Sequence, residues 1–354
     1  MGHAYKVVQW TPFKKAYDLA LIIGVTVFLG SFIAVSATTF PDGQNLHPVQ
    51  LVMRATGASA FALLHLVLAI GPLTRLSPRF KPLLYNRRHM GVVTFLLALI
   101  HAGLVLMWYH GFSDTNVFVS LFASNPRYGS LNGFPFESLG FAALVILFLM
   151  ASTSHDFWNA NLGPRVWKTL HMSVYAAYGL LTAHVVLGIV QAEKSPLYGA
   201  VVALGLVTLA SLHLATGLRE RMRDTTLGRA PEDGWLRVGP ARDIPENRAF
   251  IVVLKDGERV AVFRYDDKVS AVSNVCRHQA GPLGEGCILD GLVTCPWHGF
   301  QYRPEDGCAP PPFTEKIHTY RVKIENGVVF VDPKALPPGT PTPPANVDPL
   351  TEAA

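Results

Sequence analysis

Long, uninterrupted apolar runs fill this 354-residue chain as far as Leu218, and shorter alternating runs follow. Six of the long runs approach or exceed the roughly 20 residues that a helix needs to cross a bilayer. They are Leu19–Phe40, Leu51–Leu73, Met90–Trp108, Phe136–Ser154, Trp167–Val190 and Leu197–Leu218. The first run is too long for a secretory signal and lacks a small-residue cleavage site, so we expect it to be retained. The pattern predicts a six-helix transmembrane bundle over residues 1–223.

The remainder of the chain has the pattern of a small all-β domain. Phe250–Leu254 and Val260–Tyr265 flank a Lys-Asp-Gly-Glu segment that is typical of a hairpin turn, and Asn326-Gly327 marks another turn. We expect this domain to cover residues 235–333 and to follow a polar linker, residues 224–234. Residues 334–354 are rich in proline and too polar to bury a core, so we expect them to be disordered. No internal repeat is recognisable.

The positive charges indicate how the bundle is oriented. The net charge is +5, but the basic residues lie between apolar runs rather than along one surface, which argues against nucleic acid. Lys and Arg gather in the N-terminal tail, in the second and fourth connectors and after the sixth run, whereas the alternate connectors have almost none. The positive-inside rule therefore places both termini in the cytoplasm of a bacterium, with the bundle in its inner membrane.

Two short motifs near the C-terminus supply metal ligands. Cys276-x-His278 and Cys295-x-x-His298 are separated by 16 residues. Two thiolates and two imidazoles are the ligands of a Rieske [2Fe–2S] cluster, although zinc accepts the same donors. The surrounding residues, Cys295-Pro-Trp-His298-Gly-Phe-Gln-Tyr302 and Gly307-Cys-Ala-Pro-Pro-Pro312, resemble the second ligand loop and the proline loop of the Rieske family. This resemblance favours the cluster over zinc.

The chain departs from the respiratory branch of that family at two places. The positions of its loop-bridging disulfide hold Gly281 and Trp297, and a cytoplasmic location disfavours pairing of Cys287 with Cys308. Where that branch has a serine that donates a hydrogen bond to a bridging sulfide, this chain has Phe300. The loss of one donor predicts a lower reduction potential, nearer to the ferredoxin-like branch.

Histidines inside the apolar runs are the second set of candidate ligands. An ionisable side chain in a bilayer indicates function, and imidazole is an axial ligand of haem. His101 lies 13 residues beyond Arg88 and His184 lies 16 beyond Lys168, so both are about 20–24 Å from the cytoplasmic side. Equal depth on two runs predicts that His101 and His184 bind one haem b in the outer half of the membrane.

This part of the chain resembles the ferric reductase-like transmembrane family, and within it the haem-binding membrane subunits that serve a periplasmic methionine sulfoxide reductase. The resemblance rests on the segments Pro72-Leu-Thr-Arg75, Arg87-Arg88-His-Met-Gly91 and Trp167-Lys-Thr-Leu-His171. It implies that His101, His171 and His184 are haem-associated. A second, inner haem would use His171 with His89, His65 or His213, where His89 is suggested by depth alone. His171 and His184 lie about 140° apart on an ideal helix, so two stacked haems require a bulge, a kink near Gly179 or another partner helix.

The chain has no Gly-rich nucleotide fingerprint, and after His298 it has too few histidines for the mononuclear iron of a Rieske oxygenase. We therefore expect an electron-transfer oxidoreductase without a protein nucleophile or base. A cytoplasmic flavin reductase or ferredoxin-like protein would reduce the cluster, and one or two haems would pass electrons to a periplasmic reductase or a quinone. The opposite direction, a ferric-chelate reductase and a non-enzymatic redox sensor or assembly subunit remain alternatives.

Overall fold

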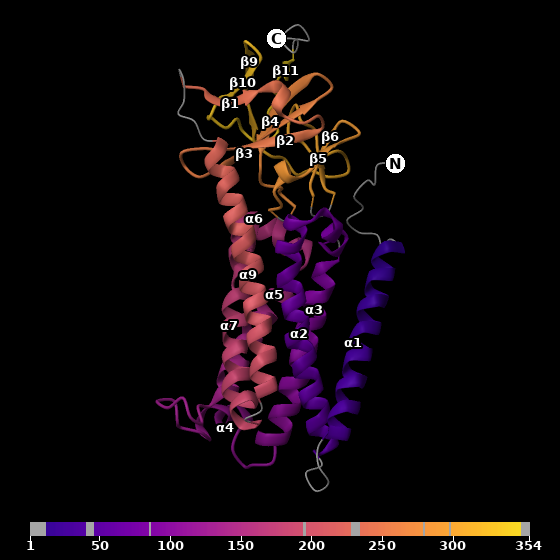
Figure 1. The fold of residues 1–354 in the computed structure, drawn as a ribbon, viewed down its shortest axis with the longest axis vertical. Helices are drawn as coiled ribbons and strands as arrows, with labels where there is room; N and C mark the ends of the chain where they lie inside the picture. Colours follow the sequence, from indigo (N-terminus) through magenta and orange to yellow (C-terminus); the bar gives the residue numbers. More distant parts are fainter. Residues whose placement is uncertain are drawn as a thin grey trace. The chain divides into compact units, whose positions relative to one another are not determined.

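The computed structural model describes residues 12–39, 46–84, 86–193, 196–227, 234–278, 280–296 and 299–347. The chain forms two compact units (Figure 1). One is helical and comprises residues 10–155 and 169–214; the other comprises residues 1–9, 156–168 and 215–354 and contains all the described strands. The expected order, a helical region followed by a β-rich domain, is confirmed.

Nine α-helices and two π-helical segments are assigned in the described ranges. The helices are α1 (Pro12–Thr39), α2 (Pro48–Leu76), α3 (Arg87–Val105), α4 (Val117–Ala123), α5 (Phe136–Ser152), α6 (Asp156–Met172), α7 (Val174–Val185), α8 (Gln191–Glu193) and α9 (Pro196–Leu227). The π-helical segments are η2 (Leu106–His110), which continues α3, and η3 (Val186–Val190), which continues α7. A 3-10 helix, η1 (Pro78–Leu84), follows α2.

Five helical stretches are long and apolar enough to cross a membrane. They are Lys14–Thr38, Pro48–Leu76, Arg87–His110, Val166–Glu193 and Pro196–Arg219. The remaining expected span, the fourth run Phe136–Ser154, corresponds to α5, which is apolar but only 17 residues long. Large apolar side chains cover the outside of these helices, as lipid contact requires; on α1, for example, Ile22 and Val27 are 61 and 63 % exposed.

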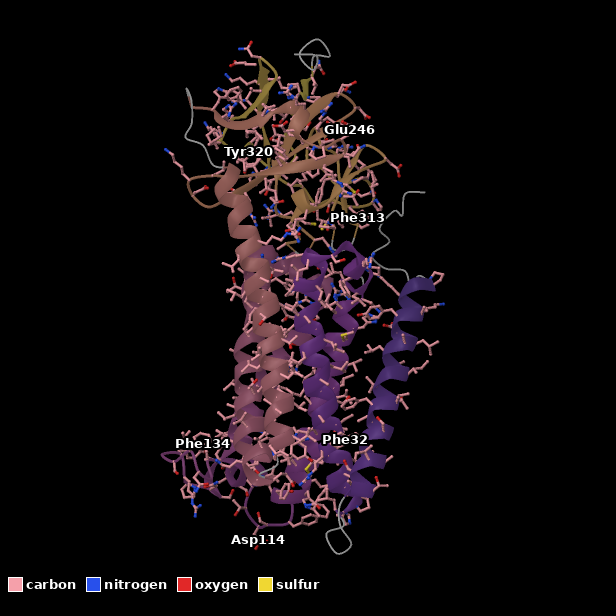
Figure 2. The ribbon with its side chains drawn as sticks, viewed as in Figure 1. Phe32, Asp114, Phe134, Glu246, Phe313 and Tyr320 are labelled. Carbon is pink, nitrogen blue, oxygen red and sulfur yellow. The ribbon has the colours of Figure 1, made fainter. Side chains whose placement is uncertain are left out.

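Within the helical unit, α2 packs against α3 and α5 packs against α7 (Figure 1). Half of the membrane-crossing part of α2 is buried, so α2 is the most enclosed of the five long stretches. One apolar cluster joins Leu64 and Leu68 of α2 to Tyr178 of α7 and Leu209 of α9. Asp114 and Phe134, on the connectors before α4 and α5, lie at the same end of this unit (Figure 2).

The fifth apolar run is broken between α6 and α7, at Ser173. The Ser173 hydroxyl donates a hydrogen bond of 2.6 Å to the carbonyl of Leu170, which precedes the first residue of α7 by four positions. A local bond of this kind competes with regular helix bonding. A kink near Gly179 is one of three alternatives for the stretch between His171 and His184; the helix assignment is interrupted at Ser173, and Gly179 lies inside α7.

The β-domain consists of three small antiparallel sheets. The first is β1 (Leu236–Pro240), β10 (Val328–Val331) and β9 (Val322–Glu325), in that order. The second is β11 (Ala345–Asn346), β4 (Lys268–Ser273), β3 (Arg259–Tyr265) and β2 (Arg248–Val253), with β8 (Thr319–Tyr320) also pairing with β4. The third is β5 (Cys287–Leu289), β6 (Leu292–Thr294) and β7 (Gln301–Tyr302). The hairpin expected around residues 255–258 is the β2–β3 connection.

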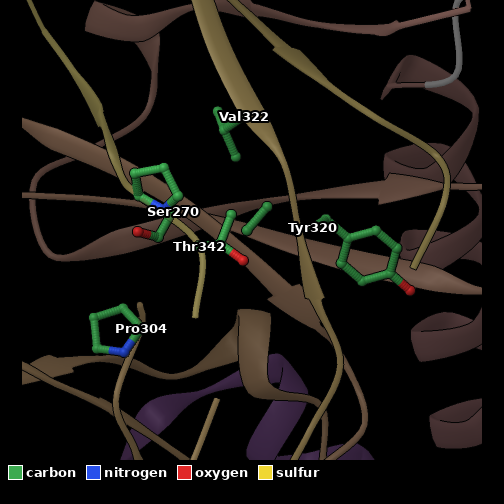
Figure 3. Close-up of a pocket in the computed structure, with 7 residues that line it drawn as sticks. Ser270, Pro304, Tyr320, Val322 and Thr342 are labelled. Carbon is green, nitrogen blue, oxygen red and sulfur yellow. The ribbon is translucent and has the colours of Figure 1, made fainter. Parts of the chain in front are cut away.

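The prediction of a disordered proline-rich tail is wrong for residues 334–347. The backbone N–H groups of Leu336, Gly339 and Thr342 donate to carbonyls of the β-domain, and β11 pairs with β4. Prolines remove only their own donors, so the residues between them still bond to an open strand edge. Thr342 and Pro343 also line a shallow hollow beside Tyr320 (Figure 3). Residues 348–354 lie outside the described range.

The segment expected to be a linker begins inside a helix. The last helix, α9, continues to Leu227, so residues 224–227 are helical, and residues 228–233 lie outside the described range.

Candidate functional site

The two candidate cysteine ligands, Cys276 and Cys295, lie in loops that share one backbone pattern. In each loop the cysteine carbonyl accepts a hydrogen bond from the N–H four residues on, and its own N–H donates to the carbonyl five residues on, at 2.8–2.9 Å. Ala280 and Gly299, the residues four positions after Cys276 and Cys295, both have positive φ angles, 54° and 72°. Left-handed residues allow each loop to turn back tightly. The two loops therefore have the same backbone geometry, and a side-chain hydrogen bond between Cys276 and Cys295 joins them.

The described candidate metal ligands are buried, and one of them has a lowered thiol pKa. Cys276, Cys295 and His278 are 0, 2 and 5 % exposed, and all four cysteines are free, as expected. Burial opposes ionisation of Cys276, but hydrogen bonds from Cys295 and Tyr302 together with His278 lower the pKa of its thiol to about 7. A thiolate is the form that binds iron or zinc. His298 and Trp297 lie outside the described residues, so the structure places three of the four candidate ligands.

Two aromatic residues that follow the second Cys–His motif contact the residues of the first motif. The Tyr302 hydroxyl lies 3.5 Å from the Cys276 sulfur and accepts a hydrogen bond of 2.9 Å from the Arg277 N–H. Phe300 is 1 % exposed and stacks on the His278 ring, with ring centres 5.3 Å apart and planes 5° from parallel. The sequence identified Phe300 only as a missing donor; in the structure it fixes the orientation of a ligand ring.

His101 on α3 and His184 on α7 face each other inside the helical unit. Their ring centres are 6.3 Å apart and their planes are 81° apart. Each Nδ1 donates to a helix carbonyl at 2.8 Å, that of Met53 for His101 and that of Phe136 for His184. This leaves Nε2 of each ring for a metal. Two metal–nitrogen bonds of about 2 Å, with about 1 Å from each nitrogen to its ring centre, give roughly the observed separation. The pair fits the two axial positions of one haem.

The surroundings of these two histidines are repeated. Met53 precedes His101 by 48 residues, and Phe136 precedes His184 by 48 residues. A π-helical segment follows each histidine, η2 in one case and η3 in the other. The pair α2–α3 thus corresponds to the pair α5–α7. The sequence shows no recognisable repeat, because the two helix pairs share few side chains besides the histidines.

The other membrane histidines differ in their bonding. His65 contacts the Phe61 carbonyl through Nδ1 and the Tyr178 hydroxyl through Nε2, at 2.8 and 2.9 Å. His213 makes the same two kinds of contact, with the Leu209 carbonyl and the Tyr175 hydroxyl, at 3.0 and 3.1 Å. Both ring nitrogens of each are therefore engaged, which argues against iron ligation by either one.

His89 and His171 lie at equivalent places before the facing pair, 12 residues before His101 and 13 before His184. His89 Nδ1 lies 2.9 Å from a carboxylate oxygen of Asp18 on α1, and Asn86 contacts both groups. An imidazole held by a carboxylate through one nitrogen is common among metal-bound histidines. His171 is in the last turn of α6, directly before the break at Ser173.

Comparison with known proteins gives two family matches. Residues 56–182 match the ferric reductase like transmembrane component, and residues 234–321 match the Rieske [2Fe-2S] domain. The helical region is similar to the haem-binding subunit MsrQ of protein-methionine-sulfoxide reductase. The subunit from Herminiimonas arsenicoxydans is 32 % identical over 145 residues, covering 40 % of this chain and 62 % of that protein. The subunit from Bordetella pertussis is 31 % identical over 166 residues, covering 46 and 75 %.

The β-domain is similar to a solved structure, a complex of reduced oxygenase and oxidised ferredoxin in carbazole 1,9a-dioxygenase. The identity is 26 % and the TM-score is 0.28, covering 30 % of this chain and 99 % of that one. The chain is thus a multi-pass membrane protein that carries an iron–sulfur domain of the Rieske type.

Proposed function

The chain belongs to the MsrQ-like ferric reductase transmembrane components and carries a C-terminal Rieske [2Fe-2S] domain, and from this we propose that it transfers electrons between a cytoplasmic donor and an acceptor outside the membrane. The cluster is held by Cys276, His278, Cys295 and His298. The observation that carries the proposal is the facing pair of His101 and His184, which gives the membrane unit a redox site of its own.

Haem b bound at this pair supplies one-electron redox chemistry at low solvent exposure. The protein's part is to hold two neutral imidazoles at a fixed separation. The Met53 and Phe136 carbonyls each accept an Nδ1–H, so the tautomer that presents Nε2 to iron is selected before the cofactor binds. Two residues of the β-domain have a similar role. Tyr302 holds Cys276 by a hydrogen bond, and Phe300 holds His278 by stacking on its ring.

For an inner haem we propose His171 and His89 as ligands. Their positions before His184 and His101 correspond in the repeated helix pairs, and Asp18 holds His89 through Nδ1. The interruption of regular helix bonding at Ser173 supports this pairing, because the angle between His171 and His184 then need not be the 140° of an ideal continuous helix. His65 and His213 are the weaker candidates, since each is already bonded through both nitrogens.

We also propose that α5 crosses the membrane as a sixth span. Its 17 residues are at the lower limit for a helix that spans the hydrocarbon core, and it packs against α7 along its length. Six spans place both termini on one side, and the basic connectors select the cytoplasmic side. The domain limits expected from the sequence, residues 1–223 for the membrane unit and 235–333 for the Rieske domain, belong to this proposal, with the β-domain extended to Val347.

Electron transfer across the membrane requires a donor on one side and an acceptor on the other. A flavin reductase or a ferredoxin-like protein is proposed as the donor, because the chain shows no nucleotide fingerprint of its own. A periplasmic reductase or a quinone is proposed as the acceptor, and the name of the relatives, haem-binding subunits of a reductase, supports the first of these.

A difference spectrum of the purified chain tests the function. Dithionite-reduced minus oxidised protein should show b-type bands, and EPR of the same sample should show a Rieske signal. His101→Ala and His184→Ala should each remove the b-type absorbance of the haem bound at this pair and leave the Rieske signal, whereas His155→Ala, in the turn between α5 and α6, should change neither. A wild-type spectrum without b-type bands contradicts the proposal.

A further inference from the structure

Two glycines lie directly against the facing histidines. Gly57 on α2 is four residues after Met53, and Gly140 on α5 is four residues after Phe136. A Cβ placed on Gly57 would lie 2.8, 2.9 and 3.3 Å from Nδ1, Cε1 and Cγ of His101. A Cβ on Gly140 would lie at the same three distances from the same atoms of His184. Any other residue at either position would collide with the ring.

The reason for this arrangement lies in helix geometry. A helical carbonyl points toward the residue four positions on, whose N–H it accepts, and the Cβ of that residue normally covers it. Without a Cβ at Gly57, the Met53 carbonyl is open to a second donor, the His101 Nδ1–H. Gly140 opens the Phe136 carbonyl to His184 in the same way. Glycine is otherwise unfavourable inside a helix, so its use at both places needs a reason.

We propose that Gly57 and Gly140 are positioning residues, which hold the His101 and His184 rings perpendicular to each other for axial ligation of one haem. The inference rests on the proposed ligation by this pair. Each glycine supplies a flat contact for one ring, and the carbonyl one turn earlier supplies the hydrogen bond that stops the ring from rotating. The observed angle of 81° between the two planes is the consequence.

His65 shows that contact with a glycine is not sufficient. A Cβ on Gly205 of α9 would lie 2.8 Å from His65 Nε2, the nitrogen that contacts the Tyr178 hydroxyl. There the glycine adjoins the nitrogen that a metal would need, and the Nδ1 bond goes to the histidine's own helix. At Gly57 and Gly140 the glycine adjoins Nδ1 and leaves Nε2 to the iron.

The perpendicular rings predict a spectroscopic signature. When the two axial imidazole planes are parallel, the iron dπ orbitals are split and the low-spin ferric EPR signal is rhombic. When the planes are perpendicular these orbitals are nearly degenerate, and the signal is strongly anisotropic with one large g value. We expect the wild-type chain to give the anisotropic signal, together with the separate Rieske signal after reduction.

The test uses the full-length chain with Gly57→Ala and Gly140→Ala. Each variant should move the low-spin signal toward the rhombic form or convert part of it to high spin, and should shift the midpoint potential of that haem. Gly103→Ala and Gly179→Ala are matched controls on α3 and α7, where an added Cβ meets nothing within 4 Å. Both controls should leave the signal and the potential at their wild-type values.

Two results would overturn the inference while leaving the proposed function in place. One is an unchanged EPR signal and potential in Gly57→Ala and Gly140→Ala. The other is a wild-type chain without the strongly anisotropic low-spin signal, a result that overturns the inference even if the variants do not fold. Failure of the proposed function would look different, because b-type absorbance would then be undiminished in His101→Ala and His184→Ala or absent from the wild type.

Discussion

The hydroxyl of Tyr302 lies 3.5 Å from the sulfur of Cys276, and the N–H of Arg277 donates to the same hydroxyl at 2.9 Å. The second bond leaves the phenol proton to point at the sulfur. Burial and the neighbouring Cys276 raise the pKa of Tyr302 well above its usual value, so the phenol keeps that proton. The arrangement gives the cluster one donor from the protein, although the donor expected at position 300 is missing.

Replacement of Tyr302 by Phe should lower the reduction potential of the cluster. A donor to sulfur stabilises the reduced, more negative state, and loss of a hydrogen bond of about 1 kcal/mol corresponds to a fall of roughly 40 mV for one electron. The measurement is a redox titration of the Rieske EPR signal. Tyr265→Phe is the control, because its hydroxyl contacts Ser270 and Glu305 instead. An equal shift in both variants would contradict this role for Tyr302.

The choice of inner ligands can be tested by counting haems. His89→Ala and His171→Ala should each reduce the haem content by about half, since one of two bis-histidine sites is lost. His65→Phe and His213→Phe should keep the wild-type content, because these rings are bonded to Tyr178 and Tyr175. The pyridine haemochrome assay measures the result. If loss of His65 or His213 removes a haem and loss of His89 does not, the proposed pairing is wrong.

Removal of the C-terminal segment should destabilise the β-domain. Truncation after Pro333 exposes the edge of β4, removes Val347 from the apolar core and leaves the Thr319 hydroxyl without Thr342, whose hydroxyl lies 3.0 Å away. The single change Thr342→Val should cost about 1 kcal/mol. Thermal loss of the Rieske EPR signal is the readout, and removal of residues 350–354 alone is the control. Equal stability of the two truncated chains would refute an ordered structural role for the segment.

The hydrogen bonds of Asp306 should make the β-domain less stable in acid. Partial burial opposes ionisation of Asp306, but bonds from Arg303 and the Cys308 N–H outweigh it and lower the pKa of the carboxyl. A lowered folded-state pKa gives stability that is complete above the unfolded value, about 4, and is lost as the pH falls through the folded value. Asp306→Asn should reduce the acid-dependent loss of the free energy of unfolding by less than about 1 kcal/mol, since Arg303 is exposed. An unchanged acid limb in the variant would contradict the assignment.

The sequence predicted those features that depend on composition or on a motif. Apolar runs identified the long helices, and the two Cys–His motifs identified the Rieske domain. Equal depth brought His101 and His184 together correctly, because both count from a basic connector along a regular helix.

The features that the sequence did not predict depend on contacts between distant segments. The carbonyls of Met53 and Phe136 carry no side-chain signal, and the glycines beside them looked like ordinary small residues. The tail appeared disordered because composition does not show that Leu336 and Thr342 find acceptors on the β-domain. The fifth run is interrupted at Ser173 and not at Gly179. The Ser173 hydroxyl bonds to a backbone carbonyl and so competes with helix bonding, whereas Gly179 has no side chain that could do this.

We propose that electrons pass between the Rieske cluster and the membrane haem of one chain. The most direct measurement is rapid mixing of the oxidised full-length protein with a reduced ferredoxin, following the cluster by freeze-quench EPR and the haem by its b-type absorbance. The account predicts that the cluster is reduced first and the haem after it, and that Cys276→Ser abolishes haem reduction while the variant still binds haem. Haem reduction at the wild-type rate in Cys276→Ser would contradict the account.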